Sequence, residues 1–147
     1  MLRGRELNIW AGRILTDVSF QYIYIVSPFI TDICIDGRNR FSSMLMRLAK
    51  SAHVYLLTRP PRDTAEIRFL EGLKEGGISV YVNSLLHAKL ILAKRSQTSG
   101  LAIIGSANLT YSGFWKNLEI ALLVDEPHVI GRLNEEVERL IALSRSY

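Results

Sequence analysis

Apolar residues recur along this chain with two different periods, and the period changes several times. Apolar side chains three or four residues apart predict an amphipathic helix over residues 5–17. The β-branched and aromatic run that follows predicts a buried strand ending at Ser27 and Pro28. The same patterns predict further helices over about 38–51 and 63–75, and further strands over 53–59 and 78–83. This alternation is typical of an α/β layer fold with a largely parallel first half.

Local signals mark the ends of two of these helices. Asp63, with Glu66 three residues later, resembles a capping box that opens a helix. Asp125 is predicted to cap the last helix, with Pro127 in its first turn. The apolar stripe of that helix consists of Val129, Ile130, Leu133, Val137, Leu140 and Ile141, while Glu135, Glu136 and Glu138 are expected to face mostly outward. We therefore predict a single domain, 1–147, with a mixed, mostly parallel β-sheet flanked by helices on both faces.

Residues 87–119 form the stretch in which polar side chains interrupt the apolar strands. A strand leads into a polar turn at 95–100, and a second strand follows it. Because side chains alternate along a strand, His87 and Lys89 should share one face, while Leu90 and Leu92 should point into the core.

A hairpin that pivots between residues 97 and 98 places residues 106–108 opposite His87. Ser106 and Asn108 should therefore lie beside His87 and Lys89, and Gly105 should allow a close backbone approach there. An ammonium group, a hydroxyl and an amide suit the binding of a phosphate.

Composition and charge limit the classes of binding partner that we expect. The 147 residues are 48% hydrophobic and 22% charged, as in a globular domain. The single cysteine, Cys34, excludes an intrachain disulfide and a cysteine-rich metal site. Residues 1–118 carry 15 Lys or Arg against 8 Asp or Glu, whereas residues 119–147 carry 3 against 6. A basic body favours anionic partners such as nucleic acid or lipid headgroups, and ordinary solvated charge is the alternative.

No apolar run approaches the roughly 18 residues that a membrane span requires. Glu6, Arg13 and Asp17 interrupt the apolar pattern near the N-terminus, so we expect no signal peptide and no membrane partner. We expect a soluble protein in the cytoplasm.

The polar positions of residues 87–119 resemble the signature of the phospholipase D superfamily, which is His-x-Lys, four residues, Asp and a later Gly-Ser-x-Asn. His87-Ala88-Lys89 and Gly105-Ser106-Ala107-Asn108 match it, and Glu119 stands where the family has an acidic residue. The exit of the first strand, Ser27-Pro28-Phe29, is also similar. Lys94 replaces the signature Asp. Since Lys94 lies about 23 Å from His87 along an extended strand, we expect this change to affect local structure and not chemistry.

The resemblance implies a phosphodiesterase that needs no metal or other cofactor. His87 would attack phosphorus and form a phosphohistidine, while Lys89 and Asn108 would stabilise the phosphoryl oxygens with support from Ser106. Glu119 would accept the other ring N–H of His87. Because the chain has one motif and the chemistry uses two histidines, we expect a homodimer with both His87 side chains at the interface.

Among substrates, the basic body favours nucleic acid, DNA more than RNA, and hence an endonuclease. Ser27, Arg59 and Lys116 are candidate substrate-binding residues, and Arg62 and Arg95 are further candidates, with plain surface charge as the alternative for the basic ones. Tyr111, Phe114 and Trp115 are candidates for stacking on bases or for packing in the core or dimer interface. Two other functions stay open: a non-catalytic nucleic-acid-binding or scaffold module, and a phospholipase or phosphatidyl transferase.

Overall fold

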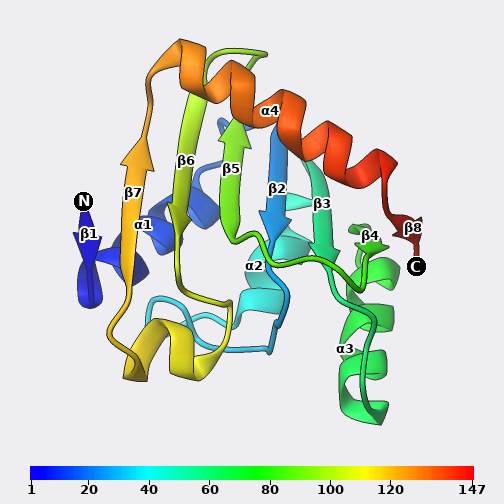
Figure 1. The fold of residues 1–147 in the computed structure, drawn as a ribbon. Helices are drawn as coiled ribbons and strands as arrows, with labels where there is room; N and C mark the ends of the chain where they lie inside the picture. The colour runs from blue at the N-terminus through cyan, green and yellow to red at the C-terminus, as the bar shows by residue number, and fades with distance from the viewer.

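Eight strands form one sheet in the order β1-β7-β6-β5-β2-β3-β4-β8 in the computed structural model, which describes residues 1–147 (Figure 1). The strands are β1 (Leu2–Arg3), β2 (Tyr22–Val26), β3 (His53–Thr58), β4 (Ser79–Val82), β5 (Leu90–Lys94), β6 (Gly100–Gly105), β7 (Ile120–Val124) and β8 (Arg145–Ser146). The helices are α1 (Arg5–Thr16), α2 (Phe41–Leu48), α3 (Thr64–Glu75) and α4 (Pro127–Ala142), and a π-helical turn, η1 (Ser112–Lys116), precedes β7.

Helices cover both faces of the sheet, which confirms the predicted α/β class. The apolar sides of α1, α2 and α3 pack on one face and build the larger core. On the other face α4 lies alone across the strands (Figure 1), and its Ile130 and Val137 pack against Tyr24, Leu57 and Leu92. None of the helices is both long and apolar enough to cross a membrane.

The prediction that the sheet is mostly parallel is wrong. Only β2 with β3 and β3 with β4 run parallel, and the five other neighbouring pairs are antiparallel. The reason is that β5 inserts antiparallel beside β2, so the meander β5-β6-β7 extends the sheet on that side. The parallel alternation is therefore confined to the β2-β3-β4 half.

The helix caps differ in detail from the prediction. The Asp63 carboxylate accepts the N–H of Glu66 at 2.9 Å, as an N-cap should. The Glu66 carboxylate does not close a capping box, because it accepts the backbone N–H of Arg62 at 2.6 Å. The cap of α4 is Glu126 and not Asp125. Glu138, expected to face outward, instead accepts the Tyr24 hydroxyl at 2.7 Å.

One edge of the sheet gathers the ends that carry the predicted site. The carboxyl ends of β2 and β3 reach this edge, and the registers Val26↔Leu90 and Leu90↔Ile104 bring the start of β5 and the end of β6 to it. The pairing of Gly105 with Ala121 adds the start of β7. Lys94 pairs with Gly100 at the opposite edge. The topology therefore separates the motif residues from the position where the signature changes.

Candidate active site

An open groove of about 790 Å³ lies where α4 leaves the sheet uncovered, at the edge just described. Its floor is formed by the ends of β5 and β6, and its wall by one flank of α4. Four of the predicted catalytic residues line it: His87, Lys89, Ser106 and Asn108. The structure thus brings together the side chains that the hairpin arithmetic predicted to meet.

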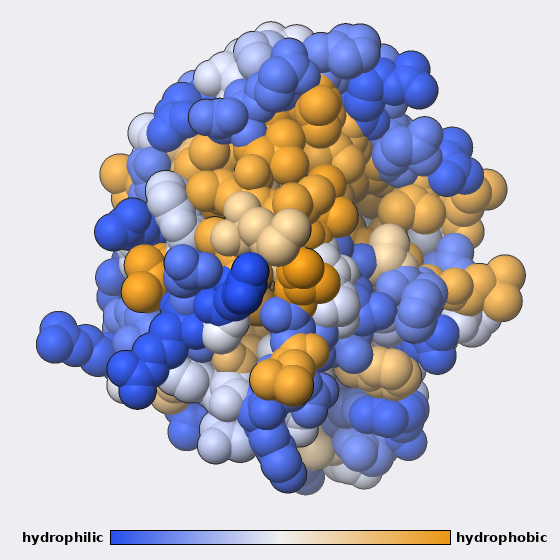
Figure 2. Space-filling model, turned by 60° about the vertical axis from the view of Figure 1, so that its left-hand side comes forward, coloured by the Kyte–Doolittle hydropathy of each residue, from blue (hydrophilic) through white to orange (hydrophobic).

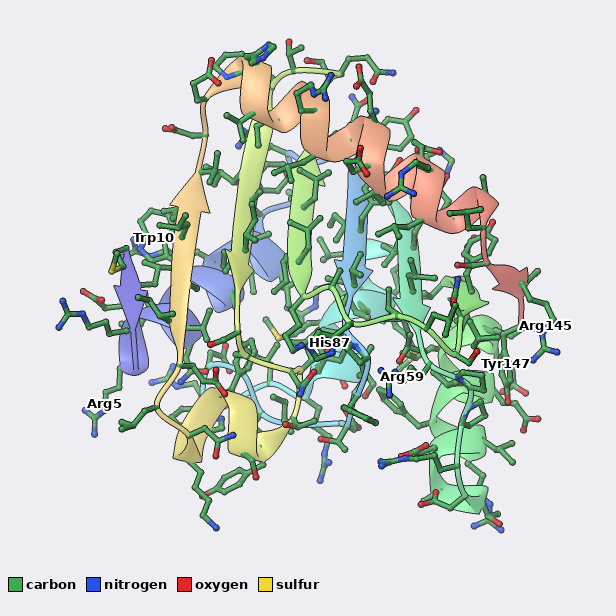
Figure 3. All side chains as sticks on the ribbon, viewed as in Figure 1. Arg5, Trp10, Arg59, His87, Arg145 and Tyr147 are labelled. Carbon is green, nitrogen blue, oxygen red and sulfur yellow. The ribbon has the colours of Figure 1, made fainter.

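His87 and Lys89 precede the strand and are not part of it. β5 begins at Leu90, so the three residues of the His-x-Lys motif belong to the connection from β4. Figure 3 shows His87 beside the start of β5, and this residue is exposed. The Lys89 ammonium donates to the His87 carbonyl at 2.9 Å. Leu90, predicted to point into the core, is half-buried and lines the same groove.

Ser106 is held between β6 and the start of β7. Its hydroxyl donates to the Glu119 carboxylate and accepts the N–H of Ile120 at 3.2 Å. Gly105 makes this arrangement possible, because a Cβ there would lie 2.5 Å from the Ile120 carbonyl oxygen and 2.7 Å from the Ala121 Cβ. The predicted close backbone approach at Gly105 is therefore confirmed. Within the single chain, Glu119 is engaged by Ser106.

Asn108 begins the turn that leads into η1. Its backbone carbonyl accepts the N–H of Thr110 at 2.8 Å, and η1 packs closely against it because Gly113 has no side chain. The amide oxygen of Asn108 is buried and has no hydrogen-bond partner.

Ser27 supports this turn from β2. The residue is 1% exposed. Its hydroxyl donates to the Phe29 carbonyl at 2.8 Å and accepts the Leu109 N–H at 3.1 Å. Ser27 was predicted to bind substrate, but the structure places it beneath the surface, where it holds the residue after Asn108.

The predicted basic contacts divide between two edges. Arg59 lies beside the groove: its Nε donates to the Leu86 carbonyl at 2.8 Å, which ties β3 to the residue before His87 (Figure 3). Lys116 is exposed at the end of η1 on the same edge. Arg62 lines a separate pocket. Arg95 lies at the opposite edge, where it pairs with Asp17 at 3.2 Å, so it does not share the groove.

Lys94 is buried beneath α4 at the opposite edge. The residue is 4% exposed. Its ammonium donates to the Asn134 side chain and lies 5.3 and 5.5 Å from the ring centroids of Tyr22 and Tyr24. Burial lowers the pKa of Lys94, and the carboxylate of Glu138 opposes that shift. The position that departs from the signature therefore serves the packing of α4.

Only one imidazole lines the groove. The ring of His53 stacks on Tyr22 at 5.2 Å near the other edge, and His128 is exposed at the start of α4. No group of three or more His, Cys, Asp or Glu side chains is placed to hold a metal ion. The groove within one chain therefore offers a single histidine.

Two features of this edge were not predicted from the sequence. Glu136 and Arg139 of α4 line the groove and pair with each other at 2.9 Å, although Glu136 was expected to face mostly outward. The tie between Arg59 and Leu86 joins residues 27 positions apart. Helical periodicity marked which side of α4 is apolar, but nothing local indicated where along the sheet that helix would lie.

Proteins of known structure share this fold. The phospholipase D family member Nuc from Salmonella typhimurium has a similar fold, with a TM-score of 0.74 and 18% identity over 93% of this chain and 90% of that one. NucT from Helicobacter pylori is similar with a TM-score of 0.72 and 12% identity, over 97% of this chain and 93% of that one. TrmBL2, an archaeal chromatin protein, matches with a TM-score of 0.66 and 12% identity, over 99% of this chain and 53% of that one.

No curated protein matches the sequence. Residues 16–141 match the family described as "Cardiolipin synthase, PLD-like domain", and this range includes the groove and the elements from β2 to β7 with most of α4. The chain therefore belongs to the phospholipase D superfamily.

Proposed function

We propose that this protein is a metal-independent phosphodiesterase, an endonuclease that cleaves DNA at a site shared by two subunits. The observation that carries the proposal is the convergence of His87, Lys89, Ser106 and Asn108 on one open groove. These side chains supply a nucleophile, a fixed positive charge and neutral hydrogen-bond donors, which is what phosphoryl transfer requires.

In the first step a ring nitrogen of His87 attacks phosphorus, and the bond from phosphorus to one ester oxygen breaks. The departing oxygen takes a proton from the partner's His87, so a phosphohistidine and a free hydroxyl result. In the second step the partner's His87 removes a proton from water. The resulting hydroxide attacks phosphorus, and the P–N bond breaks to restore His87. Imidazole changes its protonation near neutral pH, so this side chain suits both roles.

The remaining residues stabilise charge and position. Lys89 and the Asn108 amide would face the non-bridging oxygens, where negative charge grows in the transition state. Glu119 would accept the second ring N–H of His87 and fix its tautomer, with Ser106 holding the carboxylate in place. Arg59 and Lys116 would contact neighbouring phosphates, which favours binding without reading the base sequence.

The need for a second subunit follows from the single imidazole and is supported by the surface beside it. On the side of the sheet where α4 packs, Ile120 and Leu122 of β7 are 51% and 50% exposed. Ile104 and Leu90 continue this apolar face into the groove. Figure 2 shows a broad apolar area bordered by polar side chains. An exposed apolar face of this kind is typical of an interface, and a two-fold axis beside the groove would bring two copies of His87 together.

Cleavage of plasmid and single-stranded DNA in excess EDTA tests the chemistry. We expect wild type to cut both, and His87→Ala to lose at least about a thousandfold in rate, as when a nucleophile is removed. His128→Ala is the matched control and should keep the wild-type rate. Acid quenching during turnover should trap a labelled phosphohistidine in wild type alone. Unchanged cleavage by a folded His87→Ala variant would refute the assignment.

The dimer is tested by Leu122→Glu. Two carboxylates carried into an apolar interface cost several kcal/mol each, so the dimer should dissociate at least about a thousandfold more readily. Analytical ultracentrifugation should show monomer, and cleavage should disappear although circular dichroism stays native. Val18→Glu, at a 70% exposed position beyond α1, is the control and should remain dimeric. A wild type that is monomeric while cleaving DNA would exclude the shared site.

A second candidate substrate is a phospholipid. Leu85 and Leu118 are 87% and 104% exposed, and they lie two residues before His87 and one before Glu119. Apolar side chains that project beside a phosphodiester site favour contact with lipid. Release of headgroup from phosphatidylcholine or phosphatidylglycerol vesicles would support this function, and cleavage of DNA alone would exclude it.

A further inference from the structure

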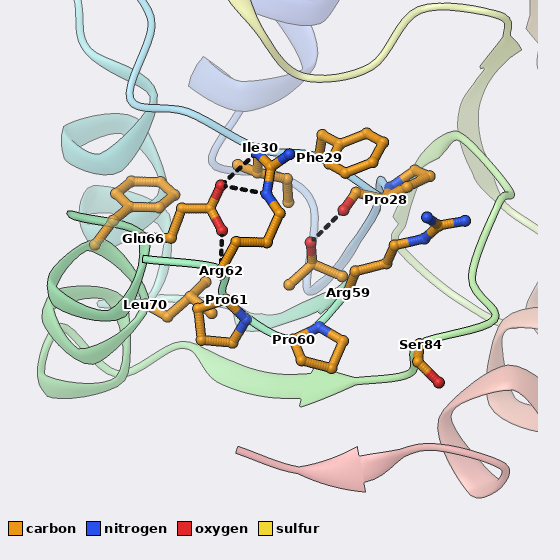
Figure 4. Close-up of a pocket in the computed structure, with 12 residues that line it drawn as sticks. Pro28, Phe29, Ile30, Arg59, Pro60, Pro61, Arg62, Glu66, Leu70 and Ser84 are labelled. Atoms are coloured by element: carbon orange, nitrogen blue, oxygen red, sulfur yellow. Dashed lines mark hydrogen bonds and ion pairs between the residues drawn. The ribbon is translucent and has the colours of Figure 1, made fainter. Parts of the chain in front are cut away.

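A second cavity, of about 420 Å³, opens beside the groove, between the carboxyl ends of β2 and β3 and the start of α3 (Figure 4). Its volume lies in the range of about 300–1,000 Å³ that is usual for small-molecule sites. Aromatic, aliphatic and proline side chains make up much of its wall, and two arginines stand among them. None of the residues proposed to take part in phosphoryl transfer lines this cavity, although Arg59, proposed to contact a neighbouring phosphate, does.

The ring of Phe29 is the central aromatic surface of the cavity. It is half-buried, and the guanidinium carbons of Arg59 and Arg62 lie 5.3 and 4.8 Å from its centroid. Figure 4 shows the ring with Arg62 to one side and Arg59 to the other. Unpaired bases stack on aromatic rings and on planar guanidinium groups. The cavity therefore presents the two kinds of surface on which a base can stack.

Glu66 favours a base over a phosphate on the Arg62 side of the cavity. Its carboxylate lines the cavity and accepts from the Nε of Arg62 at 3.0 Å and from the Arg62 backbone N–H at 2.6 Å. The hydrogen bond from the Arg62 side chain holds the pKa of Glu66 below its ordinary value, so the group is ionised at neutral pH. Beside this carboxylate a phosphate would be repelled, whereas the N–H groups of a neutral base could donate to it.

The cavity is joined to the nucleophile by one side chain. Arg59 lines the cavity, and its Nε donates at 2.8 Å to the carbonyl of Leu86, the residue before His87. A polynucleotide with one phosphate at His87 would thus pass Arg59 on its way to Phe29.

We propose that this cavity binds an unpaired base close to the cleaved phosphate, stacked on Phe29 and the guanidinium group of Arg62, and so selects single-stranded nucleic acid. The proposal rests on the phosphodiesterase function proposed above and adds its substrate class. A base in a duplex is covered by its neighbours and cannot enter a side pocket, so a double strand must open before this contact forms.

Cleavage of single-stranded oligonucleotides, each with one abasic residue at a different position, tests the proposal. For wild type we expect one or two positions beside the cut at which loss of the base lowers kcat/KM by about 5- to 150-fold, the range for one stacked base. Phe29→Leu should show a loss of that size on the intact oligonucleotide and no further loss at the sensitive positions. Arg62→Gln should behave similarly, while the matched control Arg68→Gln, exposed on α3, should match wild type.

A binding measurement separates this proposal from the chemistry. In the His87→Ala background, a 2-aminopurine is placed at each position of the oligonucleotide in turn. Its emission should change on binding at one or two positions, and Phe29→Leu should abolish the change. If the protein binds but never cleaves, the phosphodiesterase function fails while this signal still supports the cavity. If it cleaves and no abasic position matters, or if Phe29→Leu slows the abasic and intact oligonucleotides equally, the base site is refuted and the phosphodiesterase stands.

Discussion

The substitution Lys94→Asp restores the aspartate of the family signature. We expect it to destabilise the protein without lowering the cleavage rate of the folded form. The surroundings of Lys94 suit a cation. The Asn134 side chain accepts from its ammonium, the rings of Tyr22 and Tyr24 lie beneath it, and the Glu138 carboxylate lies nearby. An aspartate there loses these attractions and faces Glu138 with a like charge.

The magnitude follows from burial. Lys94 is 4% exposed, and a buried charge without compensation costs about 3–5 kcal/mol. The free energy of unfolding of a domain of this size is about 5–15 kcal/mol. For most values in that range, the substitution therefore removes a third or more of the stability. With a urea slope near 2 kcal/mol/M, the unfolding midpoint should fall by about 1.5–2.5 M.

Urea titration by circular dichroism measures the midpoint, and cleavage by the folded variant is measured at the same temperature. Lys94→Met keeps the length of the side chain and adds no charge, so its midpoint should stay much closer to wild type. Lys50→Asp, at an exposed position, controls for net charge. A midpoint for Lys94→Asp equal to that of wild type would refute the reasoning on burial. A lower rate for the folded variant would refute the separation of Lys94 from the groove.

The same lysine gives stability a pH dependence whose sign is fixed. Burial lowers the pKa of Lys94 in the folded state, so between that pKa and the unfolded value the unfolded chain binds more protons. The free energy of unfolding should therefore rise with pH through this alkaline window relative to Lys94→Met. In both proteins the free energy of unfolding should then fall above about pH 10, because burial raises the pKa of Tyr24 and Tyr55 and the unfolded chain releases those protons first. Parallel curves for the two proteins would contradict this account.

Two further substitutions test how the groove is built. Gly105→Ala places a Cβ 2.5 Å from the Ile120 carbonyl oxygen, so overpacking should lower the free energy of unfolding by about 1–3 kcal/mol in a urea titration. Because the clash should also displace Ser106, the cleavage rate should fall by more than the loss of folded protein explains. Ser27→Ala leaves the buried Leu109 N–H without its acceptor and should cost about 1–3 kcal/mol and slow cleavage, although Ser27 does not line the groove. A Ser27→Ala variant that loses stability but keeps the wild-type kcat would limit this residue to a structural role.

The sequence was enough to predict the hairpin and what it gathers. Alternation along a strand and the length of one turn are local properties, and they predicted that Ser106 and Asn108 would lie near His87. The observed register, Leu90 with Ile104 and Lys94 with Gly100, differs from the predicted pivot by half a residue. The same arithmetic predicted that Lys94 would lie far from the site, and the structure places it at the opposite edge.

Other features depended on contacts between distant segments. The antiparallel entry of β5 beside β2 made most strand pairs antiparallel, and no local pattern states which strand will neighbour which. The two-residue edge strands β1 and β8 and the π-helical η1 are too short to leave a period in the sequence. The Asp63 carboxylate caps α3 as predicted. The Glu66 carboxylate instead binds the guanidinium group of Arg62, which competes with the backbone N–H of the capping box.

By itself, then, the sequence determined the layer class, the hairpin and the chemical groups that meet at one end of it, because these depend on spacings of a few residues. The tertiary structure decided the rest: the flank of α4 that forms the groove wall, the link from Arg59 to the loop of His87, and the cavity around Phe29. Each of these joins residues tens of positions apart, and their contact is set by how whole helices and strands pack rather than by any neighbour in the chain.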